Sequence, residues 1–215
     1  MYRAKWPLGT EARLMFDILH YTFLRLGDAH RFGPPHLRQI VRKMAVQIAT
    51  EKSRGNTTVT VPVHPEFAES LRAARAAGIS GAEVFTGKKF RGRVLPMNKK
   101  ARAMKFKKYA VLAGANEPKK SCHGVRKARA EVAAYADCTE SQMMAMFGWT
   151  DPKMLAHYIA QANREKLGIS GMEKIVAFDQ SQSLDDFMEV PEANSMATPT
   201  ANGVVTFPCN IRKKA

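Results

Sequence analysis

The segment 121–166 contains three short motifs that decide how the rest of the chain is interpreted. It reads SCHGVRK at 121–127, FGWTDP at 147–152 and AHYI at 156–159. The first motif places His123 and Arg126 three residues apart, and residues with this spacing share one face of a helix. The last motif holds Tyr158, nine residues after Trp149. We interpret the rest of the chain as the scaffold and the partners of this tyrosine.

The chain is strongly basic for its size. Its 215 residues include 34 Lys and Arg against 19 Asp and Glu, a formal net charge of +15. Such a balance favours a polyanionic partner, with nucleic acid first and an anionic membrane surface second. A basic protein without any such partner is the alternative. Hydrophobic residues at 45% and charged residues at 25% are ordinary for one globular domain with a sizeable core.

The cysteines and the N-terminus indicate a cellular compartment. Three cysteines, Cys122, Cys138 and Cys209, are widely spaced and form no CxxC pair. This pattern argues against a disulfide framework and against a zinc site, and it fits a reducing compartment. No apolar run approaches the roughly 18 residues of a membrane span, and no signal peptide is predicted. We expect a cytoplasmic protein that has no membrane partner.

Helical periodicity and capping residues dominate the first 168 residues. Thr10 and Asn98 can each cap a long helix, and residues 139–142 form a capping box. Gly148 can end the short helix that follows this box, and Asp151, followed by proline, can open the next. We therefore predict helices over 11–24, 65–78, 99–113, 123–136 and 140–147, and one from 153 that includes Tyr158.

One β-hairpin interrupts the helices. Residues 46–51 and 58–63 alternate apolar and polar side chains, and the Lys-Ser-Arg-Gly-Asn sequence between them is typical of a turn. Pro62 suggests that the second strand lies at a sheet edge. Lys52 stands where the first strand meets the turn, and residues 81–96 are predicted to be irregular. The predicted fold class is α+β, mainly helical, with a small β-hairpin or sheet at one edge.

Basic side chains cluster along the chain after the hairpin. In helix 99–113 the side that carries Lys99, Lys100, Arg102, Lys105, Lys107 and Lys108 is interpreted as solvated or phosphate-facing. In helix 123–136 we expect Val125, Ala128, Val132 and Tyr135 to point inward. The candidate DNA-binding residues are Lys88, Lys89, Arg91, Lys99, Lys105 and Lys127.

The constellation meets the chemical needs of cutting a DNA strand without a metal. A nucleophile must attack phosphorus, fixed cations must hold the phosphate oxygens, and an acid must protonate the leaving oxygen. The chain offers Tyr158, two arginines (Arg25 and Arg126), a hairpin lysine (Lys52) and His123. Read singly, each has a structural explanation: Tyr158 can be a core residue, and Arg25 can complement a helix dipole.

Over residues 8–168 the chain resembles the tyrosine recombinases, also called phage-type integrases. The motifs that carry the resemblance are TFLRLGD at 22–28, TEKS at 50–53 with the following VTVP, HGVRK at 123–127, Gly148-Trp149, and Tyr158. Each motif is weak alone, but all five occur in the family's order and spacing. The resemblance implies the tyrosine-recombinase catalytic fold, with no metal and no cofactor.

The resemblance also implies a role for each matching residue. Tyr158 would attack the scissile phosphate and form a 3′-phosphotyrosyl link. Arg25 and Arg126 would clamp that phosphate, Lys52 would protonate the 5′-leaving oxygen, and His123 would assist proton transfer. Trp149 would be a sixth catalytic-site residue, at a position where most members have His and some have Trp. Phe23 stands where Gly is common in the family.

The resemblance implies a domain plan and partners. The plan has a lead-in (1–9), the integrase-like catalytic domain (10–168), a short C-terminal helix (169–178) and a mostly disordered tail (179–215). The separate N-terminal core-binding domain of the family is expected to be absent. The expected partners are double-stranded DNA and further copies of the chain in a tetrameric synapse. We predict a recombinase or integrase of phage or mobile-element origin; the alternatives are topoisomerase-like relaxation and a catalytically silent DNA-binding remnant.

Overall fold

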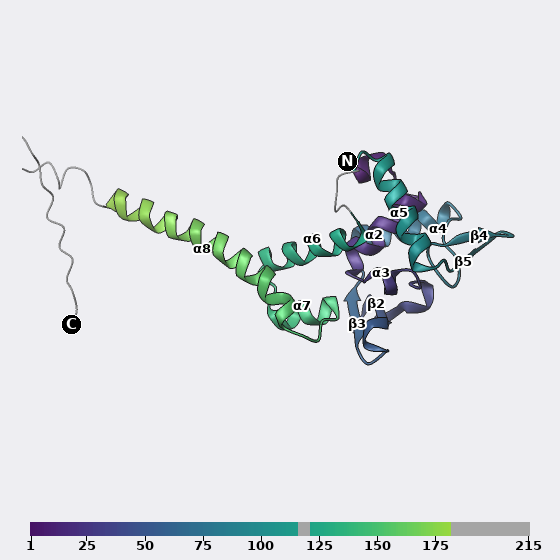
Figure 1. Ribbon diagram of the computed structural model, residues 1–215, viewed down its shortest axis with the longest axis horizontal. Helices are drawn as coiled ribbons and strands as arrows, with labels where there is room; N and C mark the ends of the chain where they lie inside the picture. The colour runs from purple at the N-terminus through teal and green to yellow at the C-terminus, as the bar shows by residue number, and fades with distance from the viewer. Residues whose placement is uncertain (116–120, 182–215) are drawn as a thin grey trace, which may run out of the picture. The chain divides into compact units, whose positions relative to one another are not determined.

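The computed structural model describes residues 1–115 and 121–181 (Figure 1). Residues Met1–Gly168 form one compact unit, and a second begins at Ile169. All predicted site residues lie in the first unit. Within the described ranges, no helix combines the length and the hydrophobicity that a membrane crossing requires.

Helices make up most of the first unit, and the predicted capping residues begin them. The helices are α1 (Tyr2–Lys5), α2 (Glu11–Thr22), α3 (Leu26–Ala29), α4 (Pro65–Ala76), α5 (Lys99–Leu112), α6 (Cys122–Tyr135), α7 (Glu140–Phe147) and α8 (Lys153–Ser181), with 3-10 turns η1 (Pro34–His36) and η2 (Glu51–Ser53). Thr10 accepts a hydrogen bond from the Arg13 amide, and Asn98 accepts one from the Ala101 amide. The capping box at 139–142 is also confirmed.

The predicted hairpin is confirmed and is part of a three-stranded antiparallel sheet. Its strands are β1 (Leu37–Ile40), β2 (Lys43–Ala49) and β3 (Thr58–Pro62), in the order β1-β2-β3. Pro62 therefore lies on an edge strand. Strand β1 was not predicted because its turn to β2 is Val41-Arg42, both at positive φ (46° and 62°). Two-residue hairpin turns with positive φ usually contain Gly, Asn or Asp, and these residues are the signal by which such turns are predicted.

Residues 81–96 were predicted to be irregular, and this prediction is wrong. They contain a second hairpin, β4 (Lys88–Phe90) paired with β5 (Arg93–Leu95). Each strand has only three residues, and every one except Val94 is exposed. Strands this short with no buried face lack the apolar alternation on which sequence-based prediction depends.

Two apolar clusters form the core, and the site lies near their boundary. The larger packs α2 against the sheet and α4 and includes Ile18, Ile48 and Phe67. The smaller joins α6, α7 and the start of α8 and includes Phe147 and Leu155. Figure 1 shows α6 leading from the α2 region to α7.

Some buried and exposed faces differ from the prediction. Arg102, assigned to the basic face of its helix, is only 1% exposed and donates to the Thr86 hydroxyl. On α6, Ala128, Val132 and Tyr135 are exposed, whereas Arg126 and three other alanines face the interior. Residue type alone suggested the opposite, because alanine gives little apolar signal although it allows close helix packing.

The two ends of the chain also differ from the prediction. Within the lead-in 1–9, the Tyr2 ring stacks on Phe16 at 5.0 Å, and the Trp6 indole donates to the Tyr109 carbonyl. The predicted short helix 169–178 is not separate, because α8 continues through it to Ser181. The predicted tail from 182 onward lies outside the described residues.

Candidate active site

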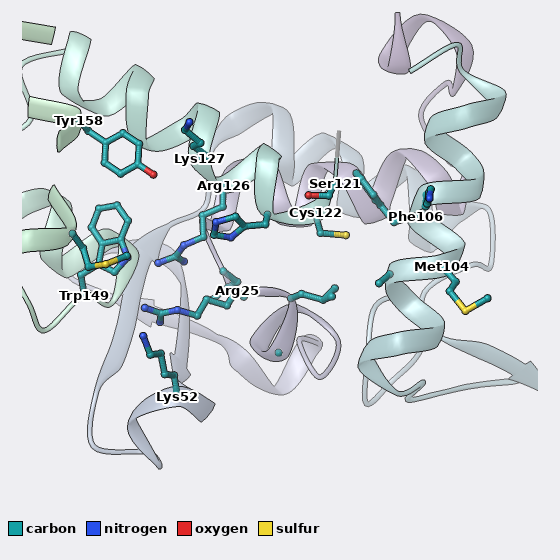
Figure 2. A pocket seen from close by; sticks show the side chains of 17 residues that line it. Arg25, Lys52, Met104, Phe106, Ser121, Cys122, Arg126, Lys127, Trp149 and Tyr158 are labelled. Carbon is teal, nitrogen blue, oxygen red and sulfur yellow. The ribbon is translucent and has the colours of Figure 1, made fainter. Parts of the chain in front are cut away.

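The six predicted catalytic residues line a single cavity of about 650 Å³ (Figure 2). They are Arg25 before α3, Lys52 in η2, His123 and Arg126 on α6, Trp149 after α7, and Tyr158 on α8. In Figure 2 the nitrogen-bearing ends of Arg25, Arg126 and Lys52 gather opposite Trp149 and Tyr158. Residues far apart in sequence are thus brought together around one space.

Arg126 is buried and held by backbone carbonyls. Its side chain is 5% exposed, and its guanidinium donates to the carbonyl oxygens of Phe23 and Phe147. It also lies 5.2 Å from the Phe147 ring centroid and 5.4 Å from that of Trp149. Burial is the larger cause and the neighbouring Arg25 charge the smaller one, and together they lower the pKa of Arg126 to about 9. The group is therefore still charged at neutral pH.

Arg25 is held by the carbonyl of Gly148, the residue that follows Phe147. Its two terminal nitrogens lie 3.3 and 3.4 Å from the carbonyl oxygen of Gly148. The carbonyl groups at a helix C-terminus carry partial negative charge, which suits a cation. The end of α7 thus orients Arg25 and Arg126 together, so that two fixed cations face one cavity.

Gly148 makes this arrangement possible through its backbone. It ends α7 at φ 57°, and a Cβ there would lie 2.6 Å from Val59 Cγ2 and 3.2 Å from Thr50 Cγ2. The positive φ and the close approach both require glycine.

Gly148→Ala is therefore expected to lower the free energy of unfolding by about 2–3 kcal/mol, measured by denaturant titration. Gly78→Ala is the matched control, since Gly78 has a similar φ of 61° but nothing within 4 Å of its Cβ position. We expect Gly78→Ala to lower the free energy of unfolding by about 1 kcal/mol. Equal losses in the two variants would show that the contact with Val59 and Thr50 is unimportant.

Lys52 is positioned through the turn that carries it. The amide of the preceding Glu51 donates to Asp28 Oδ1 at 2.8 Å, and Arg31 donates to the same oxygen at 3.0 Å. Asp28 is 1% exposed and lies in α3, which begins directly after Arg25. This carboxylate therefore ties the lysine turn to the arginine segment.

Asp28→Ala is expected to lower the free energy of unfolding by about 2–3 kcal/mol, because it leaves the Glu51 amide without its acceptor and leaves Arg31 with only the Ala49 carbonyl. Asp28→Asn keeps one oxygen for the Glu51 amide and should lose less. Denaturant unfolding of both variants checks this. An alanine variant as stable as wild type would mean that Asp28 does not anchor the turn.

An aromatic stack supports Tyr158. Ring centroids are 4.9 Å apart for Phe23 and Phe147, 4.6 Å for Phe147 and Trp149, and 6.0 Å for Trp149 and Tyr158, the last pair nearly parallel at 8°. Trp149 thus packs against Tyr158. The Tyr158 hydroxyl points into the cavity (Figure 2).

His123 lies near the exposed start of α6. Ser121 caps this helix by accepting from the Gly124 amide at 3.3 Å. The neighbouring Cys122 is buried, and burial raises the pKa of its thiol to about 11. A buried neutral thiol is a poor nucleophile at physiological pH.

Comparison with known proteins decides the family. The model of the Phage integrase family matches residues 2–165. The chain belongs to the phage integrase family. A comparison with curated protein sequences gave no significant match.

Solved structures of tyrosine recombinases share the fold of this phage integrase family member. A XerH site-specific recombinase in a post-cleavage complex with a palindromic difH substrate is 12% identical, with a TM-score of 0.62 over 80% of this chain and 50% of that one. XerA recombinase is 15% identical, with a TM-score of 0.57 over 74% and 62%. A lambda integrase(75–356) dimer bound to a COC′ core site is 17% identical, with a TM-score of 0.55 over 74% and 55%. The chain thus spans about half to three-fifths of these proteins.

The candidate DNA-binding residues of this integrase family member fall in several places. Lys127 lines the cavity. Lys99 pairs with Glu51, and Lys105 pairs with Glu11 at 2.6 Å, so an acid already offsets each charge. The remaining three, Lys88, Lys89 and Arg91, are exposed on the β4–β5 hairpin.

Several residues that shape the site were not predicted to have a role in it. Lys107 lines the cavity, although the sequence placed it only on a general basic face. Asp28 stands three residues after Arg25, a spacing that could have drawn attention to it. Phe147 and Gly148 act through their carbonyl oxygens, for which side-chain chemistry provides no signal.

Proposed function

We propose that this chain cleaves and rejoins strands of duplex DNA in site-specific recombination or integration, through a 3′-phosphotyrosyl intermediate. The observation that carries the proposal is the convergence of a tyrosine, two arginines, a lysine and a histidine on one cavity. Family membership supports the same reaction class.

The proposed step is a phosphoryl exchange at one phosphodiester. The Tyr158 oxygen attacks phosphorus and loses its proton, with His123 assisting that transfer, while the bond from phosphorus to the 5′-oxygen breaks. Lys52 donates the proton that the leaving 5′-oxygen requires. Arg25 and Arg126 hold the non-bridging oxygens, whose charge is concentrated in the transition state. One phosphoester replaces another, so rejoining is the reverse reaction and needs no external energy source.

Trp149 has a supporting role in this proposal. Most family members are expected to have histidine at this position, which can exchange a proton. The indole cannot, but its face stacks on Tyr158 and lies beside Arg126. We propose that Trp149 orients the ring of Tyr158, the nucleophile.

Double-stranded DNA and further copies of the chain are the proposed partners. The XerH structure is described as a complex with a difH substrate, and the lambda integrase structure as a dimer bound to a core site. The net charge of +15 suits a polyanion. Assembly into a tetramer on DNA and a cytoplasmic location remain predictions.

Covalent trapping tests the proposal. Duplexes with a 5′-bridging phosphorothiolate release a thiol that rejoins poorly, so a DNA–protein adduct accumulates and survives denaturing electrophoresis. We expect an adduct from a pool of duplex sequences at low salt. Salt-sensitive DNA binding without any adduct across the pool would contradict strand cleavage and favour a DNA-binding protein that has lost catalysis.

A further inference from the structure

The β4–β5 hairpin combines unpaired cations with an exposed aromatic ring. Lys88, Lys89, Arg91 and Arg93 are all exposed, and in the described ranges of the chain none of them forms an ion pair with an acid. Phe90, the last residue before the turn, is 52% exposed. The Arg91 guanidinium lies 5.3 Å from its ring centroid.

The hairpin has a fixed base and a defined tip. A Cβ on Gly87 would lie 2.0 Å from the Leu95 carbonyl oxygen, and one on Gly81 would lie 2.8 Å from Val94 Cβ. The two glycines thus let the strands pack closely against the preceding segment. At the tip, Arg91 and Gly92 have φ of 46° and 76°, as in the two-residue turns that match the twist of paired strands. Figure 1 shows the hairpin extending beyond α4 and α5.

The hairpin is linked to the lysine side of the active site. Strand β5 ends three residues before Asn98, the N-cap of α5. The first residue of that helix, Lys99, forms an ion pair with Glu51, the neighbour of Lys52. The β4–β5 hairpin is thus connected, through the start of α5, to the turn that carries Lys52.

We propose that the β4–β5 hairpin is a DNA-contacting arm, whose cations bind phosphates along one groove while the Phe90 ring inserts against the bases. The proposal rests on the proposed function, because it requires duplex DNA in the active site. A two-stranded β-ribbon has the dimensions of a DNA groove, and phenylalanine is among the side chains that wedge between base steps. Four cations within six residues, 88–93, disfavour an ordinary protein interface and suit phosphates.

Binding of the full chain to short duplexes tests the arm. Each duplex carries one 2-aminopurine, and its position is moved by one base from one duplex to the next. The fluorescence of this base rises when it is unstacked. Wild type should raise the fluorescence at one or two positions. Phe90→Ala should remove that rise and weaken binding about tenfold, because stacking on an aromatic ring contributes that much. The slope of log affinity against log salt should not change. Lys89→Ala should instead lower this slope by about one, the value of one phosphate contact.

Val41→Ala is the matched control. Val41 is 90% exposed and also stands in a two-residue turn among basic residues, but in the β1–β2 hairpin. This variant should bind like wild type. Wild-type affinity and fluorescence for Phe90→Ala would overturn the arm and leave the proposed function intact. A wild type that binds none of the duplexes would overturn both. Loss of self-association in Phe90→Ala, with fluorescence unchanged, would show that the ring contacts protein and not DNA.

Discussion

Tyr158→Phe is expected to abolish the covalent DNA adduct completely while leaving the fold and the DNA affinity unchanged. The substitution removes only the hydroxyl oxygen. Among the described residues this oxygen forms no hydrogen bond, and the ring stacks on Trp149 in either variant. We therefore expect a change in unfolding free energy below about 0.5 kcal/mol. Denaturing electrophoresis of phosphorothiolate reactions, beside fluorescence-anisotropy binding, measures both quantities.

Tyr135→Phe provides the control for this experiment. Tyr135 is an exposed tyrosine on α6 whose hydroxyl donates to Glu165, so its loss should cost little stability and should leave the adduct intact. An adduct that persists in Tyr158→Phe would mean that another residue is the nucleophile. Peptide mapping of the wild-type adduct would then identify it.

Arg126→Ala is expected to lose strand cleavage by about 1,000-fold or more, together with about 3–5 kcal/mol of stability. The catalytic loss follows from removing a fixed cation at the developing phosphate charge. The loss of stability arises because the carbonyl oxygens of Phe23 and Phe147 lose their donor in a buried place. Single-turnover cleavage is measured at a temperature where circular dichroism shows the variant to be folded.

Two further variants separate folding from chemistry. Arg126→Lys keeps the charge, but a lysine has no planar fork to reach two carbonyls and a phosphate at once. We expect it to be as poor a catalyst as the alanine variant. Arg25→Ala removes a half-buried arginine with longer hydrogen bonds, so it should lose cleavage with a smaller loss of stability. Wild-type cleavage by Arg126→Lys would show that bidentate binding is unimportant.

The regular elements were predictable where local physics decides them. Capping by Thr10 and Asn98, the box at 139–142 and the alternation in 46–63 depend on neighbours within a few residues, so helices α2, α5 and α7 and the β2–β3 hairpin followed from the sequence. The β4–β5 hairpin did not, because its strands have only three residues each and no apolar pattern marks them.

Residue type, order and spacing predict the groups that carry the proposed chemistry, which are Tyr158, Arg25, Arg126, Lys52 and His123. How these groups are held depends on contacts that form when the chain packs. The carbonyl oxygens at the end of α7, the Asp28 carboxylate and the aromatic stack under Tyr158 come from segments up to 123 residues apart. Backbone acceptors have no residue-type signature, and a buried cation such as Arg102 resembles a solvated one in the sequence. Burial and backbone geometry arise only when the chain packs, and they turn a list of reactive residues into one site.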